Sequence, residues 1–237
     1  MKKSIFAEVI AGLVLFMAAG FLLGTETEHS FDATRLRTGR FDYRMMKANT
    51  EIAKFIVTVE KAADGNFRFT GEAAGFDQKW ESIATPTFHP VSALLRMQLR
   101  DGKTYSMNLK YDDGHVTGSE QKESEPTNKI DSHVPPGTID QRIDWAAAMS
   151  SGLKVGDKFN FTVFDPATGV SQVTGEATRD EKTIVPAGTF DTLRIRYQIE
   201  KSKGTERYEV LATKALPRMM VREDFPNGTS SELVRIK

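Results

Sequence analysis

Apolar and polar residues alternate with a period of two along most of this chain. The clearest segment is 193–200, where alternate positions hold Leu193, Ile195, Tyr197 and Ile199 and the positions between them hold Arg194, Arg196, Gln198 and Glu200. Successive side chains of a strand point to opposite faces, so the segment predicts a strand with one apolar and one polar face. Pro186-Ala187-Gly188 favours a turn before it, and Lys203-Gly204 a turn into a second alternating segment at 207–213.

The same alternation recurs in short segments on both sides of this predicted hairpin. They are residues 41–45, 55–59, 67–69, 76–85, 95–99, 105–111, 159–163, 170–177, 219–225 and 232–236. Turn sequences separate several of them, and Pro226-Asn227-Gly228 between the last two is a strong hairpin signal. The pattern predicts a mostly β protein: an antiparallel, strongly curved sheet or pair of sheets, or an open β-barrel.

One segment has the period of a helix instead. Its apolar face holds Ile139, Ile143, Ala146 and Ala147. Thr138 and Gln141 match a capping box at its start, and Gly152 favours its end. We therefore predict one short helix within the β-rich body.

The first residues form a leader. Met1-Lys2-Lys3 is basic, and residues 5–24 are almost wholly apolar. This arrangement predicts either a signal peptide cut near Ala18-Ala19-Gly20 or an uncleaved N-terminal hydrophobic helix that anchors the chain in the inner membrane. Both alternatives place the rest outside the cytoplasm, in the periplasm or another extracytoplasmic space, because the basic end stays on the cytoplasmic side.

The chain is therefore divided into a signal peptide or membrane anchor at 1–24, a polar tether at 25–38 and a β-rich exported domain at 39–237. The stretch 121–137 is charged and proline-bearing, which is typical of a linker or an exposed loop. The exported domain is either one unit or two halves, 39–120 and 138–237, joined by this polar loop.

Composition excludes some kinds of partner and chemistry. Lys plus Arg and Asp plus Glu both number 32, so the formal net charge is zero and there is no basic excess to favour nucleic acid. The sequence has no cysteine, which excludes disulfides, thiolate metal ligands and a cysteine nucleophile. We predict no nucleic-acid partner and leave any protein partner unidentified.

Catalytic motifs are not found. The four histidines, at 29, 89, 115 and 133, do not have the spacing of a metal site, and Gly-x-Ser-x-Gly, a phosphate loop and a dinucleotide fingerprint are all absent. Paired carboxylates such as Asp112-Asp113 and Glu223-Asp224 fall at or near predicted turns. A glycosidase pair need not be close in sequence, so a glycan-directed hydrolase stays an alternative. We predict no cofactor, no metal and no catalytic residue.

The apolar face of the strands suggests a function. With 15 Phe, 5 Tyr and 9 Met, it can pack as a core, or it can leave a cleft in an open barrel for an acyl chain. The second interpretation predicts a lipid or glycan ligand lined by Trp80, Trp145 and Tyr197, with Arg194 and Arg196 against an anionic headgroup. The alternative is a membrane-anchored assembly protein whose open strand edges and polar loop dock a partner.

Two motifs in the C-terminal half resemble a known family. Leu153-Lys-Val-Gly-Asp157 precedes a strand, and Val185-Pro-Ala-Gly-Thr-Phe190 precedes a basic strand and a final hairpin. Together with Asp144-Trp145 before them, they resemble the bacterial envelope family called domain of unknown function 3108, over about residues 137–237. The resemblance implies an exported, antiparallel β-rich fold, and it implies no activity or catalytic residues.

Overall fold

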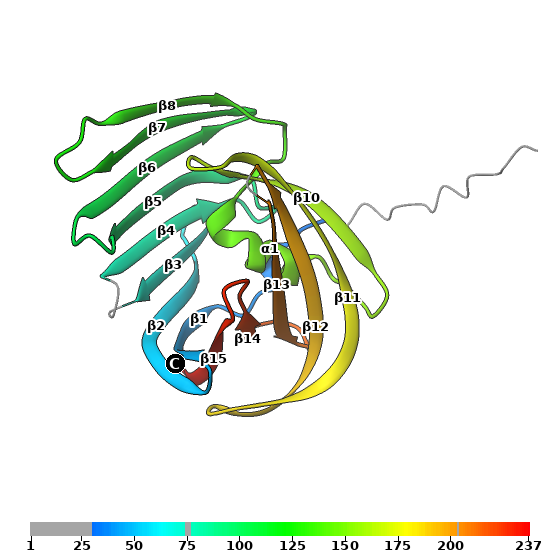
Figure 1. The fold of residues 1–237 in the computed structure, drawn as a ribbon. Helices are drawn as coiled ribbons and strands as arrows, with labels where there is room; N and C mark the ends of the chain where they lie inside the picture. Colours follow the sequence, from blue (N-terminus) through cyan, green and yellow to red (C-terminus); the bar gives the residue numbers. More distant parts are fainter. Residues whose placement is uncertain (1–29, 74–76, 203) are drawn as a thin grey trace, which may run out of the picture.

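The computed structural model describes residues 30–73, 77–202 and 204–237 (Figure 1). The predicted leader at 1–24 lies outside the described residues. In the described ranges, none of the helices has the length and apolar character needed to cross a membrane.

All the described strands belong to one 15-stranded sheet. They are β1 (Gly39–Lys47), β2 (Thr50–Lys61), β3 (Phe67–Ala73), β4 (Gln78–Ala84), β5 (Pro90–Gln98), β6 (Thr104–Asp112), β7 (His115–Lys122), β8 (Asn128–His133), β9 (Ile139–Asp140), β10 (Lys158–Asp165), β11 (Gly169–Val185), β12 (Gly188–Lys201), β13 (Gly204–Thr213), β14 (Met220–Asp224) and β15 (Thr229–Ile236). Neighbouring strands pair antiparallel, apart from the short parallel pair β9–β10.

The strand order explains how both ends of the chain meet. From one edge, β8 to β1 follow in reverse, and β1 pairs with β15, after which β14 to β9 lead to the other edge. One sheet thus runs through both halves of the chain, and Figure 1 shows it curling around the α-helix that the described residues contain. The prediction of a mostly β, antiparallel, curved sheet with one short helix is confirmed.

The helix begins later than predicted. It is α1 (Asp144–Ser150), it follows a 3-10 turn, η3 (Gln141–Ile143), and all of its residues are buried. Residues 139–140 are a strand because they pair with Val163 and Phe164 of β10. The Thr138 hydroxyl donates to the carbonyl of Pro135, and the Asp140 side chain caps η3 instead.

Two polar segments are more ordered than expected. The predicted loop at 121–137 contains β8, an edge strand in which only Ile130 is buried, so it lacks a visible apolar alternation. The described end of the predicted tether forms a 3-10 turn, η1 (Ala33–Arg35). Ala33 and Leu36 are buried there, which makes residues 33–36 part of the body.

Candidate functional site

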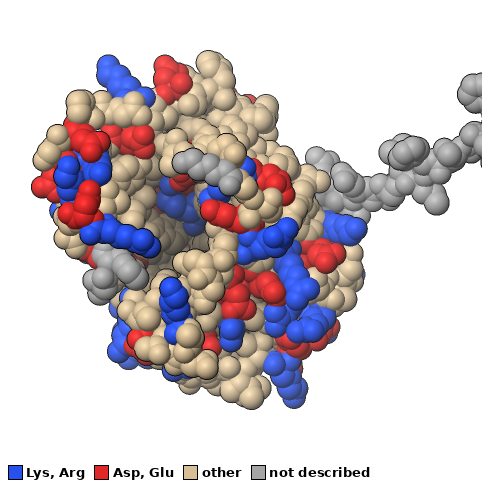
Figure 2. All heavy atoms as spheres, viewed as in Figure 1, with Lys and Arg blue, Asp and Glu red and all other residues tan. Residues whose placement is uncertain are grey.

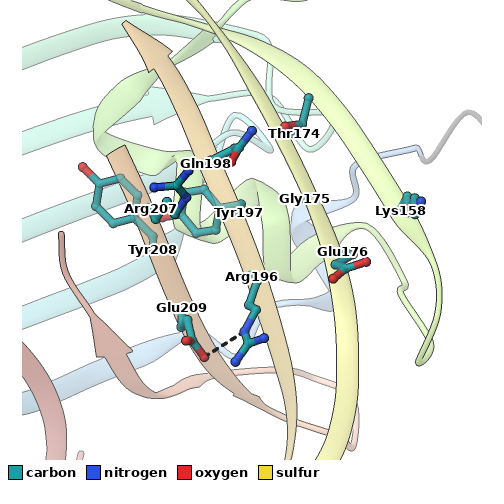
Figure 3. A pocket seen from close by; sticks show the side chains of 10 residues that line it. All are labelled: Lys158, Thr174, Gly175, Glu176, Arg196, Tyr197, Gln198, Arg207, Tyr208 and Glu209. Atoms are coloured by element: carbon teal, nitrogen blue, oxygen red, sulfur yellow. Dashed lines mark ion pairs between the residues drawn. The ribbon is translucent and has the colours of Figure 1, made fainter. Parts of the chain in front are cut away.

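Stacked aromatic rings connect the interior of the sheet with its surface. Tyr197 of β12 is buried and stacks on the half-buried Tyr208 of β13, with ring centroids 5.1 Å apart and an angle of 9° between the planes. Figure 3 shows the two rings next to each other on their strands. Phe225 meets Tyr208 edge-on at 6.4 Å. The rings share one face because Tyr197 and Tyr208 are direct partners in the strand pair.

Two buried carboxyl groups lie at the inner end of this stack. The Tyr197 hydroxyl lies 3.4 Å from Oδ1 of Asp144 and 3.5 Å from Oε1 of Glu223. Asp144 opens α1 and accepts a hydrogen bond from the backbone N–H of Trp145, while Glu223 lies on β14. Each carboxylate residue is 6% exposed, so the tyrosine bridges two acidic groups that are nearly shielded from water.

Burial changes the acidity of both groups. It raises the pKa of Asp144 to about 7, although hydrogen bonds from Trp145 and Tyr197 and the charge of Lys201 act against it. Burial, and then repulsion from Asp144, raise the pKa of Glu223 well above its usual range. Carboxyl groups in this situation titrate as a coupled pair and hold a proton more strongly than exposed ones.

A charged network borders the pair on its outer side. The Tyr208 hydroxyl donates to Oε2 of Glu206 at 2.7 Å, and the same carboxylate oxygen lies 2.6 Å from Nζ of Lys201. Lys201 is therefore already paired with an acid. On the opposite side, Tyr43 is buried and its hydroxyl donates to the carbonyl of Met220 at 2.8 Å.

The surface of the molecule has a hollow at the centre of the space-filling view, and both acidic and basic side chains border it (Figure 2). In the same view, Figure 1 places α1 there, between β3–β4 and β12–β13. Half-buried aromatic residues of β2, β4 and β13 pack against the core here: Phe55, Trp80 and Tyr208. We call this region, with Asp144 and Glu223 at its base, the mouth of the sheet.

The interior beneath the mouth is well filled. A void next to Tyr43, Trp145 and Met149 has a volume of about 10 Å³. Such a space holds at most one water molecule. The core itself therefore offers no room for an acyl chain at this point.

A groove of about 510 Å³ crosses β10–β13 (Figure 3). Its lining is formed by Lys158, Thr174, Gly175, Glu176, Arg196, Tyr197, Gln198, Arg207, Tyr208 and Glu209. Most of these side chains alternate with buried ones and so point away from the core. Arg196 pairs with Glu209 at 3.3 Å, which leaves the groove with mixed charge.

A second groove, of about 690 Å³, lies over β3–β7. Its polar lining consists mainly of Thr70, Ser106, Asn108, Ser119, Gln121 and Thr127, with Glu72, Lys79, Glu81 and Arg96. Leu94 is an exposed apolar residue within it, 43% accessible. Both grooves are open and lie on polar faces of the strands.

The structure separates the predicted lining residues into groups. Trp145 and Tyr197 both contact Asp144 at the base of the mouth. Arg194 and Arg196 point to the other face of β12, where Arg194 pairs with Glu181 and Glu209. Trp80 lies on β4, across α1 from β12, where it packs against the core opposite Gly71 and also lines the second groove.

The two carboxylates were missed as site residues. In the sequence, Asp144 stands out only as part of the family motif, and Glu223 falls at or near a predicted turn. A signal for Glu223 existed, because it shares its strand face with Met219, Val221 and Phe225 in the alternation. Among the described residues, no group of three or more acidic or histidine side chains could hold a metal ion.

Comparison with known proteins identifies the family and supports the fold. A solved structure described as a beta-barrel-like protein of domain of unknown function DUF1849, from Brucella abortus, is 14% identical with a TM-score of 0.56, covering 86% of this chain and 98% of that one. A protein with a YmcC-like fold from Bacteroides fragilis is 12% identical with a TM-score of 0.35, covering 88% and 99%. No curated protein sequence matches the chain.

The family model described as "Protein of unknown function (DUF3108)" matches residues 30–234. The match extends the resemblance seen at 137–237 into the N-terminal half, where the strands β1–β8 lie. The chain therefore belongs to the DUF3108 family.

Proposed function

We propose that this protein binds an amphipathic molecule of the cell envelope, a lipid or a glycolipid, without transforming it. The mouth is the proposed binding site. The observation that carries the proposal is the stack of Tyr197, Tyr208 and Phe225, which runs from a half-buried surface to two buried polar groups. An amphipath needs this combination, because its apolar part requires aromatic surface and its polar part requires fixed partners.

The predicted leader is the reason that the ligand is sought in the cell envelope. Residues 5–24 would deliver the chain across the inner membrane, either as a cleaved signal or as an anchor. A binding protein that is anchored in this membrane or released beside it is surrounded by lipids and glycolipids. Cell fractionation, with mass measurement of the mature N-terminus, separates the two fates of the leader.

Native mass spectrometry of the protein purified from its own envelope tests the proposal. We expect a bound mass that organic extraction removes and that lipid analysis identifies. Tyr208→Ala should lower its occupancy, because the half-buried ring forms part of the mouth. Arg196→Gln is the matched control on the other face of the same hairpin. Protein without any copurifying or rebinding amphipath would contradict the proposal.

The buried carboxyl pair also favours a second candidate, a glycan hydrolase. Carboxyl groups with raised pKa values are typical of general acids. The Tyr197 hydroxyl lies within 3.5 Å of both carboxyl groups, so it occupies the space in which a glycosidic bond would have to lie, which counts against a hydrolase. Release of reducing ends from envelope glycans, lost in Glu223→Gln, would support this candidate over binding alone.

A further inference from the structure

The carboxyl pair at the base of the mouth has few donors for its oxygens. Tyr197 has one hydroxyl proton and can donate to Asp144 or to Glu223, but not to both at once. Its distances to the two oxygens, 3.4 and 3.5 Å, are at the long end of the hydrogen-bond range. At least one carboxyl oxygen of the pair is therefore available to another donor.

A second polar group beside the pair is also unsatisfied. Ser231 of β15 is completely buried and lies directly opposite Glu223 in the β14–β15 pair. Direct partners in an antiparallel pair share a face, so the serine side chain lies beside the glutamate. Its hydroxyl oxygen has no hydrogen-bond partner among the described residues. This hydroxyl is therefore free to donate to, or accept from, a group beside Glu223.

Basic side chains near the pair are occupied elsewhere. Within the described ranges, neither Asp144 nor Glu223 has a basic group within 4.0 Å of its carboxyl oxygens. Lys201 is paired with Glu206, and Arg142 with Asp140 and Asp165. The acidic pair thus has no ion-pair partner among the described residues, and a cation bound beside it would favour the ionised form of its carboxyl groups.

Aromatic rings lie beside the same point. Tyr197 reaches both carboxyl groups with its hydroxyl and stacks on Tyr208, whose ring meets Phe225 edge-on. Aromatic faces attract cations through their ring quadrupoles, and ammonium groups are commonly held by several such rings. An anionic headgroup would instead meet two carboxyl groups at the base.

From these contacts we propose that the ligand of the mouth carries an ammonium or similar cationic group, seated against Asp144 and Glu223 with the Ser231 hydroxyl beside it. This inference rests on the proposed function and names the class of its ligand. It also assigns a role to the acidic pair, which binds the charged end while Tyr208 and Phe225 contact the apolar part.

A set of amphipaths with the same twelve-carbon chain tests the inference. Dodecylamine and dodecyltrimethylammonium are compared with dodecyl maltoside and dodecanoate, all below their micelle concentrations, by titration calorimetry on the full chain at pH 8. The cationic compounds should bind at least about tenfold more tightly than the neutral and anionic ones, as a charge-assisted contact predicts. Glu223→Gln and Asp144→Asn should each remove most of that preference.

Controls separate this inference from the proposed function. Glu209→Gln removes a carboxylate on the other face of β13 and should leave the preference unchanged. Equal affinity for all headgroups, or a cationic preference that both variants retain, would overturn the cationic class and leave the binding function intact. Failure of every amphipath to bind would overturn both. The headgroup ranking in the unmutated chain decides the matter even if a variant does not fold.

Discussion

The hydroxyl of Tyr197 lies 3.4 Å from Oδ1 of Asp144, although 53 residues separate them in the sequence. The contact joins the longest hairpin of the sheet to the first residue of the buried helix. Burial of the Asp144 carboxyl at this contact raises its pKa to about 7, while the hydrogen bond from Tyr197 acts against the shift. Structure and any ligand chemistry at the mouth therefore depend on the same pair.

The acidity of Asp144 predicts a pH-dependent stability. Its pKa is about 7 in the folded chain and about 4 when unfolded, so the folded state holds the proton more strongly. The free energy of unfolding should then fall as the pH rises from about 4 to about 7, by a few kcal/mol, and level off above that. Asp144→Asn should flatten this slope, because the amide has no charge to bury.

Urea denaturation at pH 5 and pH 8 measures the effect. The free energy of unfolding of Asp144→Asn should exceed that of the unmutated protein at pH 8, and the two values should be closer at pH 5. Part of the slope should remain, because burial raises the pKa of Glu223 as well. Asp113→Asn, in the exposed β6–β7 turn, is the control. An unchanged slope in Asp144→Asn would show that this carboxyl does not titrate as described.

Arg218 should be essential for holding the helix in place. This buried residue donates from Nη1 to the carbonyl of Met149 at 2.9 Å and from Nη2 to that of Leu153 at 2.7 Å, so it satisfies groups at the C-terminal end of α1. Arg218→Met should lower the free energy of unfolding by about 3 kcal/mol or more, since two charge-assisted bonds are lost.

Two variants make the Arg218 measurement specific. Arg218→Lys should recover only part of the loss, because one ammonium group cannot reproduce the fork of a guanidinium. Arg222→Gln removes a more exposed arginine that pairs with Asp224 and Glu232, and it should cost less than about 1 kcal/mol. Similar losses for Arg218→Met and Arg222→Gln in chemical denaturation would contradict the assigned role.

Arg142 should fasten the outer strands β5–β8 to the rest of the sheet. It pairs with the fully buried Asp140 and lies 3.4 Å from Asp165, and its Nη1 is 3.6 Å from Sδ of Met107 on β6. Arg142→Met leaves Asp140 buried without its partner, which should cost about 3–5 kcal/mol. Hydrogen exchange should rise in β5–β8 before it rises in β12.

The double variant Asp140→Asn, Arg142→Met is the matched test of that mechanism. Removing both charges also removes the uncompensated carboxylate, so the double variant should be more stable than Arg142→Met alone. If the losses of stability in Asp140→Asn and in Arg142→Met simply add in the double variant, the arginine stabilises the sheet by packing and not by pairing with Asp140.

Alternation in the sequence predicted most strands because each has one buried face. It failed for β8, whose single buried residue is Ile130, since an edge strand needs less apolar surface. The capping box at Thr138 failed because pairing of residues 139–140 with β10 overrides a local helix signal. Local patterns therefore indicate elements well where burial is strong, and poorly at the edges of the sheet.

The site could not be predicted to the same extent. Glu223 shares the apolar positions of its strand, which is a visible signal, but its meeting with Asp144 depends on the helix lying inside the curl of the sheet. The sheet that forms this curl is joined through the pairing of β1 with β15, which lie at opposite ends of the chain. The predicted Arg194 and Tyr197 are near in sequence, yet their side chains point to opposite faces.

Gly71 should determine where the Trp80 ring lies. A Cβ atom added at Gly71 would overlap the indole ring of Trp80, which is its direct partner on β4. Gly71→Ala must therefore displace the indole ring, at a cost of about 1–3 kcal/mol for an overpacked site.

The chain has only two tryptophans, so a Trp145→Phe background leaves Trp80 as the single indole fluorophore. In that background, Gly71→Ala should shift the emission to longer wavelength as the half-buried ring moves toward water, whereas Thr70→Ala, on the other face of β3, should not. An unchanged emission in Gly71→Ala would show that the ring does not rest on Gly71.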